Sequence, residues 1–185
     1  MKKLILLSAV CSAFMACNMG GNKNCATNNV AAKNKAGMMK FYDEVFNKHN
    51  PAMFDSVTTA DFVEHESDPN TPPTRDGTKK LFAMTFAAYP DVTEKVINMV
   101  ADSQFVYTHY EMTGTNTAAF MGMPATGKKI DIEGVDIVRF VNGKGVEHWG
   151  YNEEMKMMMQ MGMMPGMGGS DSSKAKMPEG DKKKM

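Results

Sequence analysis

The spacing of the apolar residues changes once along the chain, and this change limits the folds that the chain can adopt. Before residue 90 the large apolar side chains recur at the spacing of an amphipathic helix. From residue 92 onward apolar and polar residues alternate, as they do in strands that bury one face. Helices followed by consecutive strands predict an α+β fold, with the helices packed on one face of a curved antiparallel sheet.

The individual elements follow from this periodicity and from the turn residues between them. A helix is predicted over 38–49, with its apolar stripe at Met38, Tyr42, Val45, Phe46 and His49. A short helix is predicted from Asn50-Pro51, because asparagine caps helices and proline suits the first helical position. A third helix is predicted over 75–88, ending before Tyr89-Pro90. Strands are predicted over 61–66, 92–101, 104–115, 128–141 and 146–152.

The first 37 residues indicate export and anchoring rather than a folded unit. Lys2 and Lys3 precede an apolar stretch over 4–14 that is too short to span a membrane, and Ala16 then precedes Cys17. This pattern predicts a signal peptide over 1–17, lipidation of Cys17 and a membrane-anchored lipoprotein of the cell envelope; ordinary secretion is the alternative. Residues 18–37 are rich in Asn, Gly, Ala and Lys, which predicts a flexible tether.

The C-terminal residues 154–185 are of low complexity, Met-rich and then Lys-rich. Methionine accounts for 21 of the 185 residues, and the excess lies mostly after Met155. Thioether sulfurs bind copper(I), so one hypothesis is a copper-sequestering envelope protein. The alternative, which we favour, is a flexible apolar helix that caps the barrel mouth or contacts a membrane or a partner, followed by a solvated Lys-rich end. Acidic and basic residues number 21 each, and no basic patch is present to bind nucleic acid.

The domain over 38–153 resembles the SnoaL-like polyketide cyclase and ester cyclase family, of the nuclear-transport-factor-two-like superfamily. The resemblance rests on segments whose order and spacing match the family. They are Phe41-Tyr42-Asp43-Glu44-Val45-Phe46-Asn47, Phe62-Val63-Glu64-His65, Ala88-Tyr89-Pro90-Asp91, Thr113-Gly114-Thr115, the loop over 120–127, Gly134-Val135-Asp136-Ile137-Val138-Arg139-Phe140 and Val146-Glu147-His148-Trp149. The resemblance implies a cone-shaped barrel, in which three N-terminal helices and the sheet enclose a pocket. It further implies acid–base chemistry without a cofactor, and frequent homodimers.

Asp136 and His148 are the candidate catalytic pair. The last two strands form a hairpin centred near Gly143, so position 136 lies opposite position 150 and diagonal to position 148. A carboxylate and an imidazole on one face of the sheet could remove a proton from a carbon next to a carbonyl group. Asp136 would orient or act as base, and His148 would act as acid or base. Structural roles for both are the competing interpretation.

Two positions depart from the family pattern. The residue after His148-Trp149 is usually an aspartate, which we take as the family's main acid–base position, but here it is Gly150. The residue after Thr113-Gly114-Thr115 is often a histidine, but here it is Asn116. The chain is therefore expected either to bind a small apolar or carbonyl-bearing ligand without turnover, or to use Asp136 and His148 differently.

The predicted pocket is apolar and adaptable. Its expected lining is Tyr42, Tyr110, Met112, Phe120 and Met121, with His65 near the mouth; ordinary core packing is the alternative for the apolar members. His65 lies between Glu64 and Glu66, but three adjacent strand residues cannot all face one metal ion. We therefore interpret these three residues as solvated surface and expect no metal site.

Overall fold

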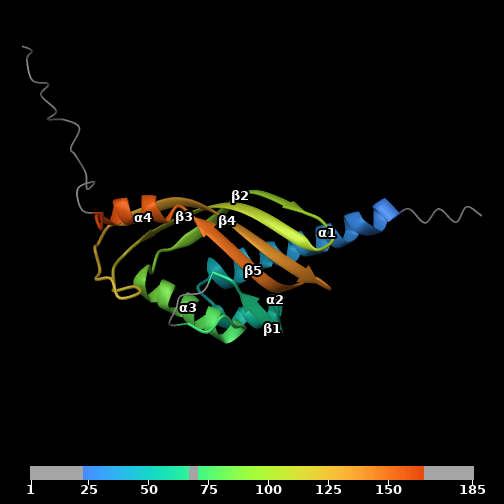
Figure 1. The fold of residues 1–185 in the computed structure, drawn as a ribbon, viewed down its shortest axis with the longest axis horizontal. Helices are drawn as coiled ribbons and strands as arrows, with labels where there is room; N and C mark the ends of the chain where they lie inside the picture. The colour runs from blue at the N-terminus through green and yellow to red at the C-terminus, as the bar shows by residue number, and fades with distance from the viewer. Residues whose placement is uncertain (1–22, 67–70, 165–185) are drawn as a thin grey trace, which may run out of the picture.

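The computed structural model describes residues 23–66 and 71–164, with the backbone alone over 23–28 (Figure 1). The predictions for the signal peptide, for lipidation of Cys17 and for the end of the Met-rich tail lie outside these residues and stay predictions. Among the described residues, no helix has both the length and the apolar character needed to span a bilayer.

The first helix is longer than its apolar stripe predicted. Helix α1 (Lys23–Lys40) continues into a π-helical segment, η1 (Phe41–Phe46). The prediction of a flexible tether through residue 37 is wrong, because this part of α1 packs on the sheet through polar and small residues. Asn34 is buried and donates a hydrogen bond to the Asp102 carbonyl, and Lys35 donates to the Met99 carbonyl. A side chain at Gly37 would lie 3.0 Å from the Phe140 ring.

The next elements are short, and they connect the first helix to the long strands of the sheet. A 3-10 turn, η2 (Pro51–Met53), leads into α2 (Phe54–Val57), β1 (Thr58–Glu64) and α3 (Arg75–Ala88). The side chain of Thr74 caps α3 by accepting a hydrogen bond from the Gly77 amide. Helix α3 ends at Tyr89, before the proline, as predicted. The three predicted helical regions are therefore confirmed, and the strand before α3 begins slightly earlier than expected.

The second half of the chain forms the sheet. Strands β2 (Thr93–Ala101), β3 (Phe105–Thr115), β4 (Lys129–Val141) and β5 (Lys144–Asn152) pair antiparallel in sequence order. Strand β1 then joins the far side of β5 and runs parallel to it, giving the order β1-β5-β4-β3-β2. The sheet is thus antiparallel except for this pair, which the sequence pattern did not predict.

The C-terminal helix α4 (Glu154–Met161) extends the chain past β5, as one predicted helical extension. The amide side chain of Gln160 exchanges two hydrogen bonds with the backbone of Asp131 on β4. Met161 is buried, and its sulfur accepts a hydrogen bond from the Tyr89 hydroxyl. Helix α4 therefore packs against one end of the barrel through Met161, whereas Met155, Met158 and Met159 are exposed. The packing interpretation holds for Met161, and the role of the exposed methionines stays a prediction.

The helices α1 and α3 lie on one face of the curved sheet (Figure 1). Buried side chains from both layers form the core; they include Tyr42, Val45, Phe46, Phe54, Val106, Tyr110, Ile130, Ile132 and Phe140. The predicted α+β class, with helices and a curved sheet around a pocket, is confirmed.

Candidate active site

A cavity of about 490 Å³ lies between the concave face of the sheet and the helices. Its wall is mostly apolar, and aromatic residues from α1, α3 and the intervening turns supply much of it. Of the predicted lining residues, Tyr110, Met112, Phe120 and Met121 line the cavity. A cavity of this size and character suits a small apolar molecule with a few polar groups.

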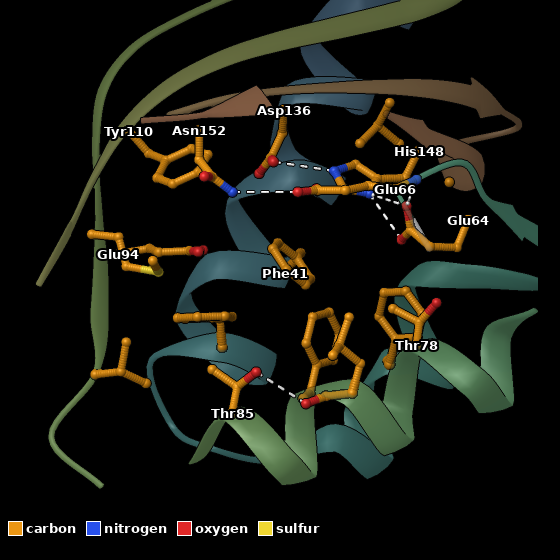
Figure 2. Close-up of a pocket in the computed structure, with 18 of the residues that line it drawn as sticks. Phe41, Glu64, Glu66, Thr78, Thr85, Glu94, Tyr110, Asp136, His148 and Asn152 are labelled. Carbon is orange, nitrogen blue, oxygen red and sulfur yellow. Dashed lines mark hydrogen bonds and ion pairs between the residues drawn. The ribbon is translucent and has the colours of Figure 1, made fainter. Parts of the chain in front are cut away.

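The predicted hairpin register is confirmed at the candidate pair. Asp136 pairs with Gly150 across the β4–β5 ladder, and Val138 pairs with His148. Asp136 and His148 consequently share the concave face, and His148 Nε2 lies 3.1 Å from Asp136 Oδ1 (Figure 2). A bulge after Arg139 shifts the register only toward the turn, beyond the pair.

The second nitrogen of His148 also has a carboxylate partner. His148 Nδ1 lies 2.8 Å from Glu64 Oε1 and 2.9 Å from Glu64 Oε2. The parallel β1–β5 pairing places Glu64 directly beside His148. Glu64 is 6% exposed, so the interpretation of this residue as solvated surface is wrong. No local sequence pattern indicates this contact, because 84 positions separate the two residues.

Tyr42 contacts the Asp136 carboxylate through the oxygen that does not contact His148. Its hydroxyl donates a 2.5 Å hydrogen bond to Asp136 Oδ2. Burial, followed by the charge of Asp136, raises the pKa of Tyr42, so the phenol keeps its proton. Tyr42 was predicted to line the pocket, but it lies behind the wall and holds Asp136 in place instead.

His148 is held as an imidazolium. Burial opposes the charge, but the hydrogen bonds to Asp136 and Glu64 outweigh it and raise the pKa of His148 well above its usual value. Both ring N–H groups then donate to carboxylates, and neither nitrogen is free to take a proton from a ligand. The imidazolium therefore serves as a fixed positive charge in the cavity wall.

Glu66 supplies the ionisable group that the sequence did not identify. Although the residue as a whole is exposed, its carboxyl group lines the cavity next to His148 (Figure 2). Asn152 Nδ2 donates a 3.3 Å hydrogen bond to Glu66 Oε1. Burial of the carboxyl group, aided by the charges of Glu64 and Asp136 and opposed by that of His148, raises the pKa of Glu66 to about 7.

The Glu66 carboxyl group occupies the space that a side chain at position 150 would fill. A Cβ atom built on Gly150 would lie 1.8 Å from Glu66 Oε2 and 3.1 Å from His148 Cε1. The absence of a side chain at Gly150 therefore makes room for the carboxyl group. A glycine on a strand that faces a cavity was the sequence signal for this close approach.

His65 lies outside the cavity wall, so its prediction as a pocket residue is wrong. Its ring stacks on Trp149 with a 4.4 Å separation between ring centres, and its Nε2 lies 3.3 Å from Glu147 Oε2. Strand alternation explains the error, since Glu64 and Glu66 face the cavity and His65 faces away from it.

Asn116 has a structural role. It is buried, its amide donates to the Ala118 carbonyl, and its side-chain oxygen accepts from the Thr126 amide. These bonds fix the loop between β3 and β4, so the departure from the family pattern at position 116 is compatible with a well-formed fold. Within residues 29–66 and 71–164, no three His, Cys, Asp or Glu side chains gather as a metal site.

The fold and the site together define a cone-shaped α+β barrel with ionisable groups in the wall of a mostly apolar pocket. The model of the SnoaL-like polyketide cyclase family matches residues 36–161, and the chain belongs to this family. No curated protein matches the chain.

Solved structures share this fold. TsrD from Streptomyces laurentii is 16% identical with a TM-score of 0.66, and the match covers 72% of this chain and 97% of TsrD. IdmH, a proposed polyketide cyclase from Streptomyces antibioticus, is 28% identical with a TM-score of 0.61 and coverages of 70% and 98%. AclR, a proposed hydroxylase from Streptomyces galilaeus, is 24% identical with a TM-score of 0.63 and coverages of 73% and 99%.

The raised pKa values predict an unusual dependence of stability on pH. Glu66 and Glu94 start from a usual pKa of 4.5, and His148 from 6.5, and in all three the folded state raises the pKa. The folded chain therefore binds more protons than the unfolded chain between these values and the raised ones, and its free energy of unfolding falls as pH rises. Urea denaturation is expected to give a larger free energy of unfolding at about pH 5 than at about pH 8.

Carboxyl groups with lowered pKa values, such as Asp91, Asp102 and Glu147, act in the opposite sense. Their contribution is present above their usual pKa and is lost as pH falls through the folded values, so it is nearly constant between pH 5 and pH 8. Equal stability at the two pH values, or greater stability at the higher one, would show that the cavity groups titrate normally.

Proposed function

We propose that this protein catalyses cofactor-free proton transfer on a small apolar molecule that carries a carbonyl group. The observation that carries the proposal is the Glu66 carboxyl group, which lines an apolar cavity and has a pKa of about 7. A general base is most effective when its pKa lies near the working pH. Membership of the SnoaL-like polyketide cyclase family supports this class of chemistry.

The proposal assigns the proton-accepting role to Glu66 rather than to His148. Both nitrogens of His148 are taken by carboxylates, and its charge favours the ionised form of the neighbouring Glu66. Asp136 and Glu64 hold the imidazolium, and Tyr42 holds Asp136. His148 is accordingly a positioning residue, with an electrostatic influence on the base.

Glu66 also accounts for the glycine at position 150. The family commonly has an aspartate at this position, so the loss of that carboxyl group would remove the base. In this chain, a carboxyl group from the end of β1 reaches the same space above β5. We infer that the acid–base function is retained and that the group has moved from β5 to the segment that directly follows β1.

The reaction that fits this arrangement begins with removal of a proton from a carbon next to a carbonyl group. Glu66 takes the proton, and the electron pair of the C–H bond moves toward the carbonyl oxygen to form an enolate. In a cyclisation, the enolate carbon forms a C–C bond to a second carbonyl carbon of the same molecule. The alkoxide formed there takes the proton back from Glu66, which returns the enzyme to its starting state.

A model substrate tests this proposal without knowledge of the natural substrate. 5-Nitrobenzisoxazole is a flat apolar molecule whose ring opens when a base removes its single reactive C–H proton, releasing a coloured phenolate. The full chain is expected to accelerate this ring opening, with a rate that rises as Glu66 ionises through about pH 7. A rate equal to that of the buffer, or one that does not change through this pH range, would favour ligand binding without turnover.

A further inference from the structure

A second carboxyl group faces the cavity without taking part in the contacts described above. Glu94 lies on β2, is 8% exposed and lines the cavity. Its Oε2 atom is buried and has no hydrogen-bond partner among the described residues. In Figure 2 the side chain extends from β2 toward the middle of the cavity. A buried polar atom without a partner is costly, so it calls for an explanation.

The backbone of Glu94 is fixed in place. Asn47 Nδ2 donates a 2.8 Å hydrogen bond to the Glu94 carbonyl, and the Glu94 amide donates a 2.8 Å hydrogen bond to Asn47 Oδ1. Asn47 directly follows η1, so the end of the first helix holds this point of β2. The side chain therefore starts from a rigid position, while its Oε2 atom is left free to contact a molecule in the cavity.

Burial, more than the charges around it, keeps the carboxyl group of Glu94 protonated. Burial is the largest cause that raises the pKa of Glu94 well above its usual value. The charges of Asp136 and Glu66 raise this pKa further, and the charge of His148 opposes the shift. The phenols of Tyr42 and Tyr110 are uncharged, because burial raises the pKa of each. Among the described residues, the cavity lining contains no lysine or arginine. Glu94 thus has an O–H group that can donate.

We propose that Glu94 donates a hydrogen bond to the carbonyl oxygen of the ligand and stabilises the enolate that forms there. This inference rests on the proposed proton transfer, since Glu66 would remove the proton whose electron pair moves to that oxygen. A carboxylic acid kept neutral by an apolar site can serve in this way. The ligand is accordingly a neutral ketone or a similar carbonyl compound, because a carboxylate would face several carboxyl groups and the positive charge of His148 is already paired with two of them.

Two probes of equal shape test the assignment. 2-Acetonaphthone carries a carbonyl group, and 2-ethylnaphthalene replaces it with a methylene group. One added hydrogen bond is worth about 1 kcal/mol, so wild-type protein is expected to bind the ketone about 5-fold more tightly than the hydrocarbon. 2-Naphthoate is expected to bind more weakly than either. The infrared stretch of the ketone carbonyl should shift to lower frequency on binding.

The variants separate this role from a packing role. Glu94→Leu is expected to abolish both the ketone preference and the infrared shift, whereas Glu94→Gln keeps an N–H donor and should keep part of each. Glu111→Leu makes the same change on β3 beside Lys95, outside the cavity lining, and this matched control should keep both. An unchanged preference in Glu94→Leu, or no preference in the wild type, would overturn the inference.

Failure of the hydrogen bond from Glu94 can be distinguished from failure of the proton transfer by Glu66. Glu66→Gln should leave the ketone preference in place, because the Glu94 donor remains. If proton transfer fails while the ketone preference depends on Glu94, the cavity is a carbonyl-binding site without turnover. If proton transfer is observed and the preference is absent, Glu66 acts without this donor.

Discussion

Glu66→Gln is expected to lower the rate constant for ring opening of 5-nitrobenzisoxazole by about 10²–10⁴-fold, the usual contribution of a general base. Glutamine keeps the size of the side chain and can still contact Asn152, but it cannot accept a proton. The measurement is the initial rate of phenolate release above pH 7, where Glu66 is ionised in the wild type. The residual rate should no longer rise through this pH range.

Two further variants make the result specific. Glu111→Gln removes a carboxyl group from the outer face of β3, beside Lys95, and should leave the rate unchanged. Gly150→Asp combined with Glu66→Ala, which clears the space beside position 150, places a carboxyl group on β5 itself and is expected to recover part of the rate. A Glu66→Gln rate within twofold of the wild type would remove Glu66 as the base.

His148→Gln is expected to reduce the free energy of unfolding by about 3–5 kcal/mol at neutral pH, the usual effect of removing one partner of a buried charge pair. Glu64 and Asp136 are 6% and 7% exposed, and each loses its positively charged partner in this variant. Glutamine can donate through one nitrogen only, so it cannot replace both contacts. Urea denaturation measures the change.

His109→Gln is the matched control for this variant. His109 also contacts a carboxylate, with its Nε2 2.6 Å from Glu133 Oε2, but both side chains are well exposed, at 40% and 52%. Exposed pairs of this kind contribute about 1 kcal/mol or less. A similar loss in the free energy of unfolding of the two variants would show that burial does not increase the contribution of the His148 contacts to stability.

The sequence predicted the part of the site that one hairpin determines. The turn near Gly143 sets the β4–β5 register, and strand alternation then places Asp136 and His148 on the same face. It did not predict Glu64 and Glu66, because the parallel β1–β5 pairing that brings them to His148 joins distant parts of the chain. Glu94 was missed for the same reason, since its burial depends on the helix that covers β2.

The extent of α1 was missed because hydrophobic periodicity was the signal used for helices. Over 29–37 the contacts with the sheet come from buried Asn34, from Lys35 and from Gly37, whose lack of a side chain allows close approach. These residues are also common in flexible linkers, so composition alone predicted a tether. Only the position of β2 and the β4–β5 turn shows that the helix has a surface to pack on.

The role of Glu66 as the base is tested most directly by a pH titration of its carboxyl group by carbon NMR, with Glu66→Gln used to assign the signal. The wild-type chain is predicted to titrate this group with a midpoint of about 7. A midpoint near 4.5, the usual value for glutamate, would contradict the assignment of Glu66 as the base, because its pKa would then not be adjusted to neutral pH.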